Sequence, residues 1–489
     1  MIYVAELLGA EASASAISPH CLPSRASPLG CWRTLRYVSS VSARNIIRLS
    51  VVQTNMEIDS TTLTDLEIFE AAGGRAGVFE LIARTTTSLG RSALRRRVCN
   101  PFSDITEIRR TQEAVAFLAR HPDLVVVADA GVRAVAKYLR SNITPPEDFV
   151  AGARLERIWW KLRYRDALEE IETGAHATVK LFEYVAKRCA SLQSVDAPAS
   201  LSEMGSSITG TAEEVLRVAS RSSTLLAMDR PLRSSLKPRI EEALRQIGEL
   251  DALNAMALTT SKRGWIFPDL VESDTFLLEA EGLHHPFLTN PVRNPVRLSG
   301  GEPMVFLTGP NMAGKTTYLR SVGLAVLLAQ IGMGIPASSA RLSPAEVLFT
   351  SLNPSDNLRA GISYFVAEVL RVREAATHLA AGKRALIIFD EVFKGTNVHD
   401  ALDASTEVIL GFARARASGC IFSSHLVELV NRLESEPSIR YCCFDAEMEH
   451  GIPRYSFRLG EGVSDRRFGL LLLKQAQVPE LIARIAAAS

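Results

Sequence analysis

The chain has 489 residues, of which 47% are hydrophobic and 22% charged, and its formal net charge is +1. At roughly 150 residues per domain, this length predicts two to four domains with sizeable cores. The near-neutral charge excludes a globally basic nucleic-acid-binding protein, so a contact with DNA would need a local basic patch. Seven scattered cysteines without paired metal-ligand spacing indicate a reducing compartment, and we expect the adjacent Cys442 and Cys443 to be strand residues.

Residues 1–55 differ in composition from the rest of the chain. They are rich in serine and arginine, and their only acidic residues are Glu6 and Glu11. The arginines include Arg25, Arg33, Arg36, Arg44 and Arg48. This composition resembles an organelle transit peptide. We expect instead a disordered segment or an incorrectly assigned start, and we leave import into an organelle open.

Residues 56–264 carry a mainly helical pattern. The apolar positions of one predicted helix are Ile105, Ile108, Val115 and Leu118. They lie close to helical spacing, and Asp104 precedes them as a candidate N-cap. The stretch Ser235–Ser261 is predicted to be one long helix with Pro238 in its first turn, where a missing N–H costs little.

Residues 265–489 have a different character. Short apolar runs alternate there with helical stretches, which indicates a parallel α/β sheet. The clearest strand candidates are Met304–Leu307, Ala385–Phe389 and Cys420–Ser423. The apolar stretch Val322–Ile335 contains Gln330 and is short for a membrane span. We therefore expect a buried helix at this place and no association with a membrane.

The segment Gly309–Thr316 fits the pattern G-x-x-x-x-G-K-[ST] and lies between a predicted strand and an apolar helix. Its residues are Gly309, Pro310, Asn311, Met312, Ala313, Gly314, Lys315 and Thr316. Glycines let the backbone close around phosphate, and N–H groups at a helix start bind the anion. Lys315 is predicted to neutralise β- and γ-phosphate oxygens, and the Thr316 hydroxyl to ligate Mg²⁺. The segment predicts an ATPase with Mg²⁺ as its metal.

Two acids and one histidine follow predicted strands. Asp390 and Glu391 come directly after Ala385–Phe389; Asp390 is predicted to hold Mg²⁺ and Glu391 to orient the attacking water. His425 follows the third strand candidate and is expected to reach the γ-phosphate or the water. The segment Leu298–Glu302 looks like the phosphate-contacting signature of transporter ATPases. Because it precedes the phosphate loop instead of following it, we expect a turn.

The segment Thr308–Thr317, with Asn-Met ahead of Gly-Lys, resembles the phosphate loop of the MutS family of DNA mismatch repair ATPases. Further segments resemble that family in the same order, over about residues 56–485. They are Asp59–Glu67, Thr85–Gly90, His285–Pro286, Leu328–Gly332, Ser363–Glu368, Asp390–Thr396, Ser424–His425, Phe468–Gly469 and Val478–Ile482. The resemblance implies an α/β P-loop NTPase domain of the ABC type at residues 265–489. An all-α core and lever domain at residues 56–264 would precede it.

The resemblance also implies how the site works. The loop and Thr317 would bind ATP, with Asn311 supporting the phosphates, while Lys315, Glu391 and His425 would act in hydrolysis. Subunits of the family dimerise with each nucleotide held between two chains, so Ser363 would contact the γ-phosphate bound to the opposite subunit. Binding of ATP would then close the dimer and move the helices that embrace DNA.

Some features depart from the family pattern. About 55 residues precede the core, fewer than the family's mismatch-reading domain needs, and the helical region is short. Ser351 stands where the family has Arg, and Phe393–Lys394 where it has Gly-Arg. We expect a homodimeric, ATP-switched clamp in the cytoplasm, at the nucleoid, which acts in mismatch repair or on branched and recombining DNA. The alternatives are an ATP-switched scaffold without mismatch recognition and an ABC-type nucleotide-binding subunit.

Overall fold

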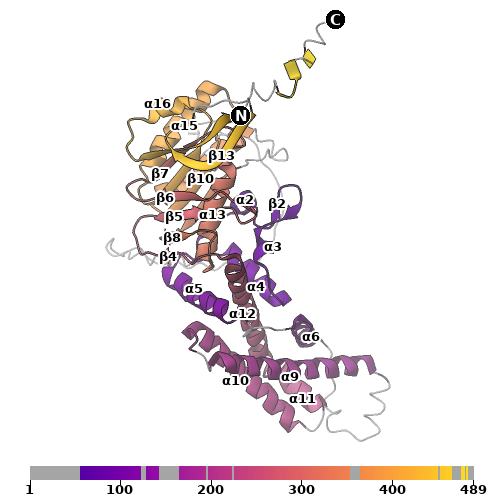
Figure 1. Cartoon of the computed structure of the whole chain (residues 1–489). Coiled ribbons are helices and arrows are strands. Elements are labelled where there is room, and N and C mark those ends of the chain that lie inside the picture. Colours follow the sequence, from indigo (N-terminus) through magenta and orange to yellow (C-terminus); the bar gives the residue numbers. More distant parts are fainter. Residues whose placement is uncertain are drawn as a thin grey trace, which may run out of the picture. The chain divides into compact units, whose positions relative to one another are not determined.

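The structure, a computed structural model, describes residues 55–122, 128–142, 163, 165–193, 196–222, 225–352, 364–449, 452–464, 475–479 and 481–482. They all belong to one compact unit, which runs from Val52 to Ser489. Helices predominate up to residue 263 and strands alternate with helices after it (Figure 1). The composition-based expectation for residues 1–54 falls outside the described residues.

The helical part is built from amphipathic helices. They are α2 (Ser60–Asp65), α3 (Val78–Ile82), α4 (Ser88–Cys99), α5 (Ile105–Arg120), α6 (Asp129–Arg140), α9 (Arg165–Gln193), α10 (Ala199–Arg221), α11 (Leu225–Arg233) and α12 (Lys237–Arg263). The predicted cap of α5 is confirmed, because Asp104 accepts a hydrogen bond from the Thr106 N–H. The predicted long helix is also confirmed, although it begins and ends two residues later than predicted. It has Pro238 in its first turn, and Gly264 with φ 62° ends it.

The α/β part contains a seven-stranded sheet in the order β1-β9-β10-β11-β7-β12-β13. Its strands are β1 (Glu57–Ile58), β7 (Met304–Thr308), β9 (Val347–Ser351), β10 (Ala385–Asp390), β11 (Gly419–Ser423), β12 (Ile439–Glu449) and β13 (Ile452–Glu461). All neighbours are parallel except β12 and β13. The three strand candidates are confirmed, each longer by one residue. Cys442 and Cys443 lie in β12 as buried free thiols, as predicted.

Both faces of this sheet are covered by apolar side chains, as a parallel sheet requires. In β7, Val305 and Leu307 belong to one hydrophobic cluster, whereas Met304 and Phe306 belong to another. The first cluster includes α13 (Lys315–Gln330). The second includes side chains of α14 (Tyr364–Ala380), α15 (Val398–Ala413) and α16 (Glu428–Leu433). The buried helix expected after the phosphate loop is therefore confirmed as α13.

A four-stranded sheet and a short hairpin complete the fold. The sheet has the order β4-β8-β5-β6, from β4 (Asp269–Leu270), β8 (Ser339–Leu342), β5 (Leu278–Leu283) and β6 (Asn294–Leu298). The hairpin pairs β2 (Glu70–Ala71) with β3 (Arg75–Ala76). The segment Leu298–Glu302 between β6 and β7 is the expected turn, closed by a 3.2 Å bond from the Ser299 N–H to the Glu302 carbonyl.

The first described residues belong to the seven-stranded sheet, which the sequence did not predict. β1 pairs with β9 at its edge. Asp65, at the end of α2, accepts hydrogen bonds from the Thr350 hydroxyl (2.8 Å) and the Leu352 N–H (2.9 Å). The start of the helical part, from β1 to α2, is thus anchored on β9 of the α/β part. The division at residue 264 stays a prediction.

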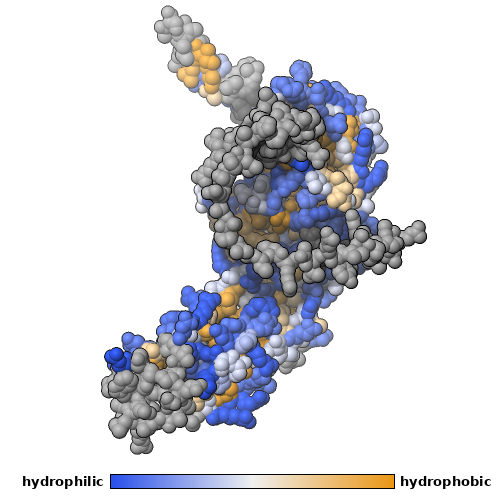
Figure 2. Space-filling model, turned by 180° about the vertical axis from the view of Figure 1, so that it is seen from behind, coloured by the Kyte–Doolittle hydropathy of each residue, from blue (hydrophilic) through white to orange (hydrophobic). Residues whose placement is uncertain are grey.

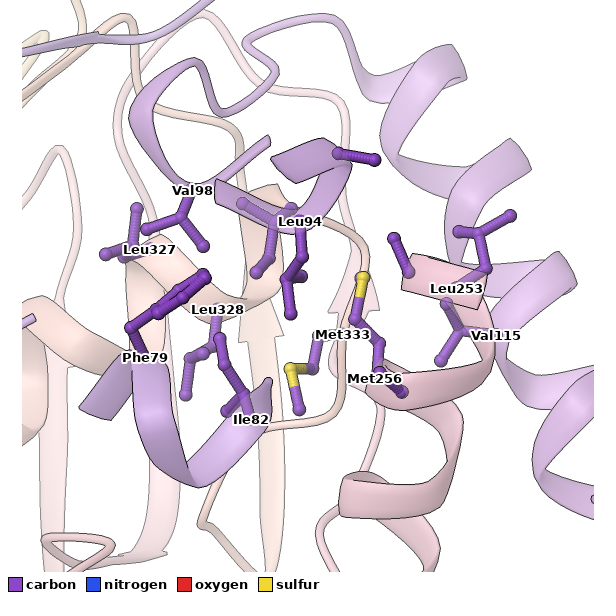
Figure 3. Close-up of a cluster of buried hydrophobic side chains, with 14 of the residues drawn as sticks. Phe79, Ile82, Leu94, Val98, Val115, Leu253, Met256, Leu327, Leu328 and Met333 are labelled. Carbon is purple, nitrogen blue, oxygen red and sulfur yellow. The ribbon is translucent and has the colours of Figure 1, made fainter. Parts of the chain in front are cut away.

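The hydrophobic core runs without a break from the helical part to α13. Figure 3 shows side chains of α3, α4, α5 and α12 packed with Leu327 and Leu328 of α13 and with Met333. The described surface of the helical part is mostly hydrophilic in the view of Figure 2. Among the described residues, no helix combines the length and the apolar character that crossing a membrane requires.

Candidate functional site

The loop predicted to bind phosphate joins β7 to α13. β7 is fully buried and ends at Thr308, and the helix begins at Lys315. Gly309 has φ 139°, and a Cβ there would lie 2.5 Å from the Phe444 carbonyl oxygen. Gly314, directly before the helix, has φ 100°. Because only glycine adopts such angles without strain, glycine is required at both ends of the loop, where the helix start offers N–H groups to an anion.

Lys315 lies inside the curve of this loop. Its side chain is 5% exposed, and its Nζ donates hydrogen bonds to the carbonyl oxygens of Gly309 (2.7 Å) and Pro310 (3.3 Å). Burial lowers the pKa of Lys315, and the nearby carboxylates of Glu391 and Asp390 act against this shift. The ammonium group can exchange its carbonyl partners for phosphate oxygens without leaving the loop.

Thr316 and Asp390 form a pair of oxygen donors. The Thr316 hydroxyl donates a 2.6 Å hydrogen bond to Asp390 Oδ2. The other carboxylate oxygen, Oδ1, is buried and has no hydrogen-bond partner among the described residues. A buried oxygen of this kind is costly unless an ion or water satisfies it. Hydroxyl and carboxylate oxygens are ligands that Mg²⁺ prefers, so this pair fits the predicted ion.

Glu391 follows β10 with φ 54°, and its N–H donates a 2.8 Å bond to the Ser423 carbonyl. Its Oε2 lies 2.6 Å from Lys394 Nζ, and its Oε1 lies 3.8 Å from Lys315 Nζ. Burial acts to raise the pKa of Glu391, but Lys394, Lys315 and His425 outweigh it, and the net shift is downward. The side chain is therefore a carboxylate at neutral pH, as a group that accepts a proton from water must be.

His425 follows β11 and lies beside this carboxylate. Its Nδ1 is 3.8 Å from Glu391 Oε2, and its side chain is 57% exposed. The structure thus brings the three predicted catalytic residues together, with Lys315 and His425 on either side of Glu391. Ser363 lies outside the described residues, so its predicted contact stays a prediction.

A cavity of about 460 Å³ opens beside the loop. Its walls include the predicted residues Pro310, Asn311, Met312, Gly314, Lys315, Thr316, Thr317 and Glu391. Gly309 and Ala313 adjoin these residues in the loop, where Ala313 is 1% exposed, and Asp390 is bonded to Thr316. The walls also include apolar side chains, among them Leu288, Pro291, Phe444 and Phe457. The last two lie against the loop, because a Cβ on Gly309 would meet Phe444 and a Cβ on Gly314 would lie 3.3 Å from Phe457 Cδ1. The cavity therefore combines polar groups suited to phosphates with apolar surface suited to an aromatic ring.

Phe457 is a wall residue that the sequence did not predict. It lies in β13 with φ 54° and is 45% exposed although it is aromatic. Asn294 fixes the strand directly after it, because its Nδ2 donates to the Phe457 carbonyl (3.0 Å) and its Oδ1 accepts from the Leu459 N–H (2.8 Å). No local pattern predicts this contact, because β6 and β13 are more than 150 residues apart.

His285 also lines the cavity without having been assigned a role in it. It is 6% exposed, its Nδ1 is 3.4 Å from the Phe287 N–H that donates to it, and its Nε2 is buried without a partner among the described residues. Burial, followed by the charge of Arg320, lowers the pKa of His285 to about 4. The ring is therefore neutral at neutral pH and carries its proton on Nε2. The His285–Pro286 pair marked this position in the sequence, but nothing in the sequence predicted that the His285 side chain would be buried.

Comparisons with known proteins agree with this arrangement. A family model described as MutS domain V matches residues 305–489, and one described as MutS domain III matches residues 61–257. The DNA mismatch repair protein MutS of Aquifex pyrophilus is 25% identical, and the match covers 88% of this chain and 61% of that protein. The MutS proteins of Bacillus pumilus and Geobacillus thermodenitrificans are 33% and 34% identical over 50% of this chain, and over 29% and 27% of their own lengths.

The chain thus spans less than two thirds of the length of these relatives. The two domain models nevertheless match the helical part and the α/β part in the order that the resemblance implies. The helical part corresponds to MutS domain III and the α/β part to MutS domain V. The chain belongs to the MutS family.

Proposed function

We propose that this chain binds and hydrolyses ATP with Mg²⁺ in a P-loop NTPase domain of the ABC type. The observation that carries the proposal is that Lys315, the Thr316–Asp390 pair and Glu391 converge at one cavity. They come from α13 and from the end of β10, as in an open parallel sheet whose ligands bind at the carboxyl ends of the strands.

Each group has one task in this proposal. Lys315 and the backbone at the start of α13 bind the phosphates. Thr316 and Asp390 hold Mg²⁺, which when bound neutralises phosphate charge. Glu391 orients a water molecule and accepts its proton, and His425 stands where it can stabilise the resulting charge. For this, Glu391 must exchange its 2.6 Å contact with Lys394 for the water.

The apolar walls of the cavity suit a nucleoside. Phe457 and the neighbouring Leu288 and Pro291 offer an exposed ring and apolar surface on which a base can stack. A nucleotide with its phosphates on the loop would have Phe457 within reach of its base, because this ring lies against the loop.

We further propose that the protein is a dimeric, ATP-switched DNA-binding protein of the cytoplasm. The three relatives described above are named DNA mismatch repair proteins, and the continuous core between the helical part and α13 offers a route by which the nucleotide can act on the helices. Ser363 would complete the site of the opposite subunit. The two classes of DNA that we propose it binds are mismatched and branched DNA.

The test is ATP binding and turnover by the purified chain and by two variants. Lys315→Ala should weaken ATP binding by about tenfold or more, because a charge-assisted hydrogen bond is lost. Glu391→Ala should bind Mg²⁺–ATP like the parent but hydrolyse it about 100-fold more slowly. Glu407→Ala, an exposed acid on α15, is the matched control and should behave like the parent. Parental turnover by Glu391→Ala would refute the assignment of this residue.

A further inference from the structure

The loop that carries Glu391 has a strained backbone. Glu391 has φ 54° and Phe393 has φ 65°, so two residues with side chains occupy the left-handed region within three positions. Such conformations persist only where the surrounding structure holds them. Since Glu391 must be placed accurately to act on water, whatever holds this loop also sets the geometry of the reaction.

Two side chains of α14 hold the loop. The rings of Phe365 and Phe393 pack with their centroids 6.0 Å apart, and Phe393 is 4% exposed. Glu368, one turn further along α14, is 1% exposed. Its Oε1 accepts a hydrogen bond from the Lys394 N–H (3.2 Å) and its Oε2 accepts one from the Gly395 N–H (3.3 Å). The buried Glu368 carboxylate thus accepts hydrogen bonds from two consecutive backbone N–H groups of the loop.

We propose that Glu368 is a positioning residue for Glu391, acting through the backbone of Lys394 and Gly395. The chain of contacts is short. Glu368 fixes the N–H groups of Lys394 and Gly395, and the strained turn that precedes them connects them to the Glu391 backbone. The inference rests on the proposed hydrolysis of ATP, and it adds that α14 controls the hydrolytic step without contacting the nucleotide.

The hydrogen-bond chemistry makes an isosteric variant informative. Glutamine at position 368 keeps the volume of Glu368 but replaces one acceptor oxygen with an NH₂ group, which cannot accept from a backbone N–H. Glu368→Gln therefore breaks one of the two contacts without opening a cavity. The matched control is Glu374→Gln on the same helix, because the Glu374 side chain is 51% exposed and bonds to Arg371.

The experiment measures kcat and the ATP dissociation constant for the full chain and these variants. Glu368→Gln should lower kcat by about 100-fold, as a misplaced catalytic group does, while the affinity for ATP stays within about twofold of the parent. Glu374→Gln should leave both quantities unchanged. Parental kcat in Glu368→Gln, or an equal loss of ATP affinity, would overturn the proposal.

Hydrogen exchange of the loop gives a readout that does not need ATP hydrolysis. If Glu368 holds the loop, the amides of Lys394 and Gly395 should exchange faster in Glu368→Gln than in the parent, with the rest of the sheet unchanged. Unchanged exchange there would refute the positioning role. If the parent itself failed to hydrolyse ATP while exchange responded as expected, the proposed function would fall and the positioning of the loop would stand.

Discussion

At the scale of single residues, burial decides what each polar side chain can do. Lys315, Asp390 and His285 are each less than 10% exposed, and each lines or adjoins the same cavity. An unsatisfied polar atom in such a place is costly. Asp390 Oδ1 and His285 Nε2 are two such atoms among the described residues, and the first belongs to the carboxylate that we propose as a Mg²⁺ ligand.

The lowered pKa of His285 predicts a pH-dependent stability. The unfolded chain protonates this histidine at a pH of about 6.5, whereas the folded chain protonates it only at about 4. The contribution of the neutral ring to the free energy of unfolding is therefore fully present above the higher pH and decreases as the pH falls below it. Between about pH 7 and about pH 5 the parent should lose about 2 kcal/mol on this account. Urea unfolding should show a smaller loss in His285→Phe, and equal losses in both proteins would contradict this origin.

At the scale of secondary-structure elements, the start of α4 is joined to the middle of α12 by one buried carboxylate. Asp251 of α12 is 1% exposed and accepts hydrogen bonds from the N–H groups and hydroxyls of Thr86 and Thr87. Thr87 in turn caps α4 by accepting from the Gly90 N–H. A Cβ on Gly90 would lie 2.1 Å from Asp251 Oδ2, so glycine is needed for the close approach.

Removing this carboxylate should destabilise the helical part. Asp251→Ala leaves the orphaned N–H groups at the start of α4 without their partner and should lower the free energy of unfolding by about 3 kcal/mol. Urea denaturation followed by circular dichroism measures the change. Glu241→Ala, an exposed acid near the start of α12, serves as the control and should change stability by less than about 0.5 kcal/mol.

At the scale of the whole molecule, the shared site of a dimer predicts how variants complement each other. Ser363→Ala and Lys315→Ala should each be inactive alone if Ser363 completes the opposite subunit's site. A mixed dimer would regain one intact site, formed by the loop of the first variant and Ser363 of the second. Random mixing should restore about a quarter of parental ATP turnover, because about half of the dimers are mixed and each has one site of two. Normal activity of Ser363→Ala alone would argue against a shared site.

Binding to DNA has a salt dependence that separates a clamp from a scaffold. With a net charge of +1, affinity must come from local contacts with phosphates, and even two such contacts should weaken binding by about tenfold between about 50 and 200 mM salt. Titrations of duplex, mismatched and four-way DNA, with and without ATP, measure this effect. Absence of binding at low salt would favour the scaffold.

Local patterns of the sequence determined the phosphate loop, the strand candidates, the long helix and the acids at the end of β10, because spacing of apolar residues and glycine-rich turns act over a few residues. The tertiary structure alone decided that Asp390 meets Thr316 across 74 residues, that Lys394 pairs with Glu391, and that Asn294 places Phe457 beside the cavity. It also decided that β1 joins the sheet, since strand partners distant in sequence are chosen by packing and hydrogen bonding, which have no periodic signature along the chain.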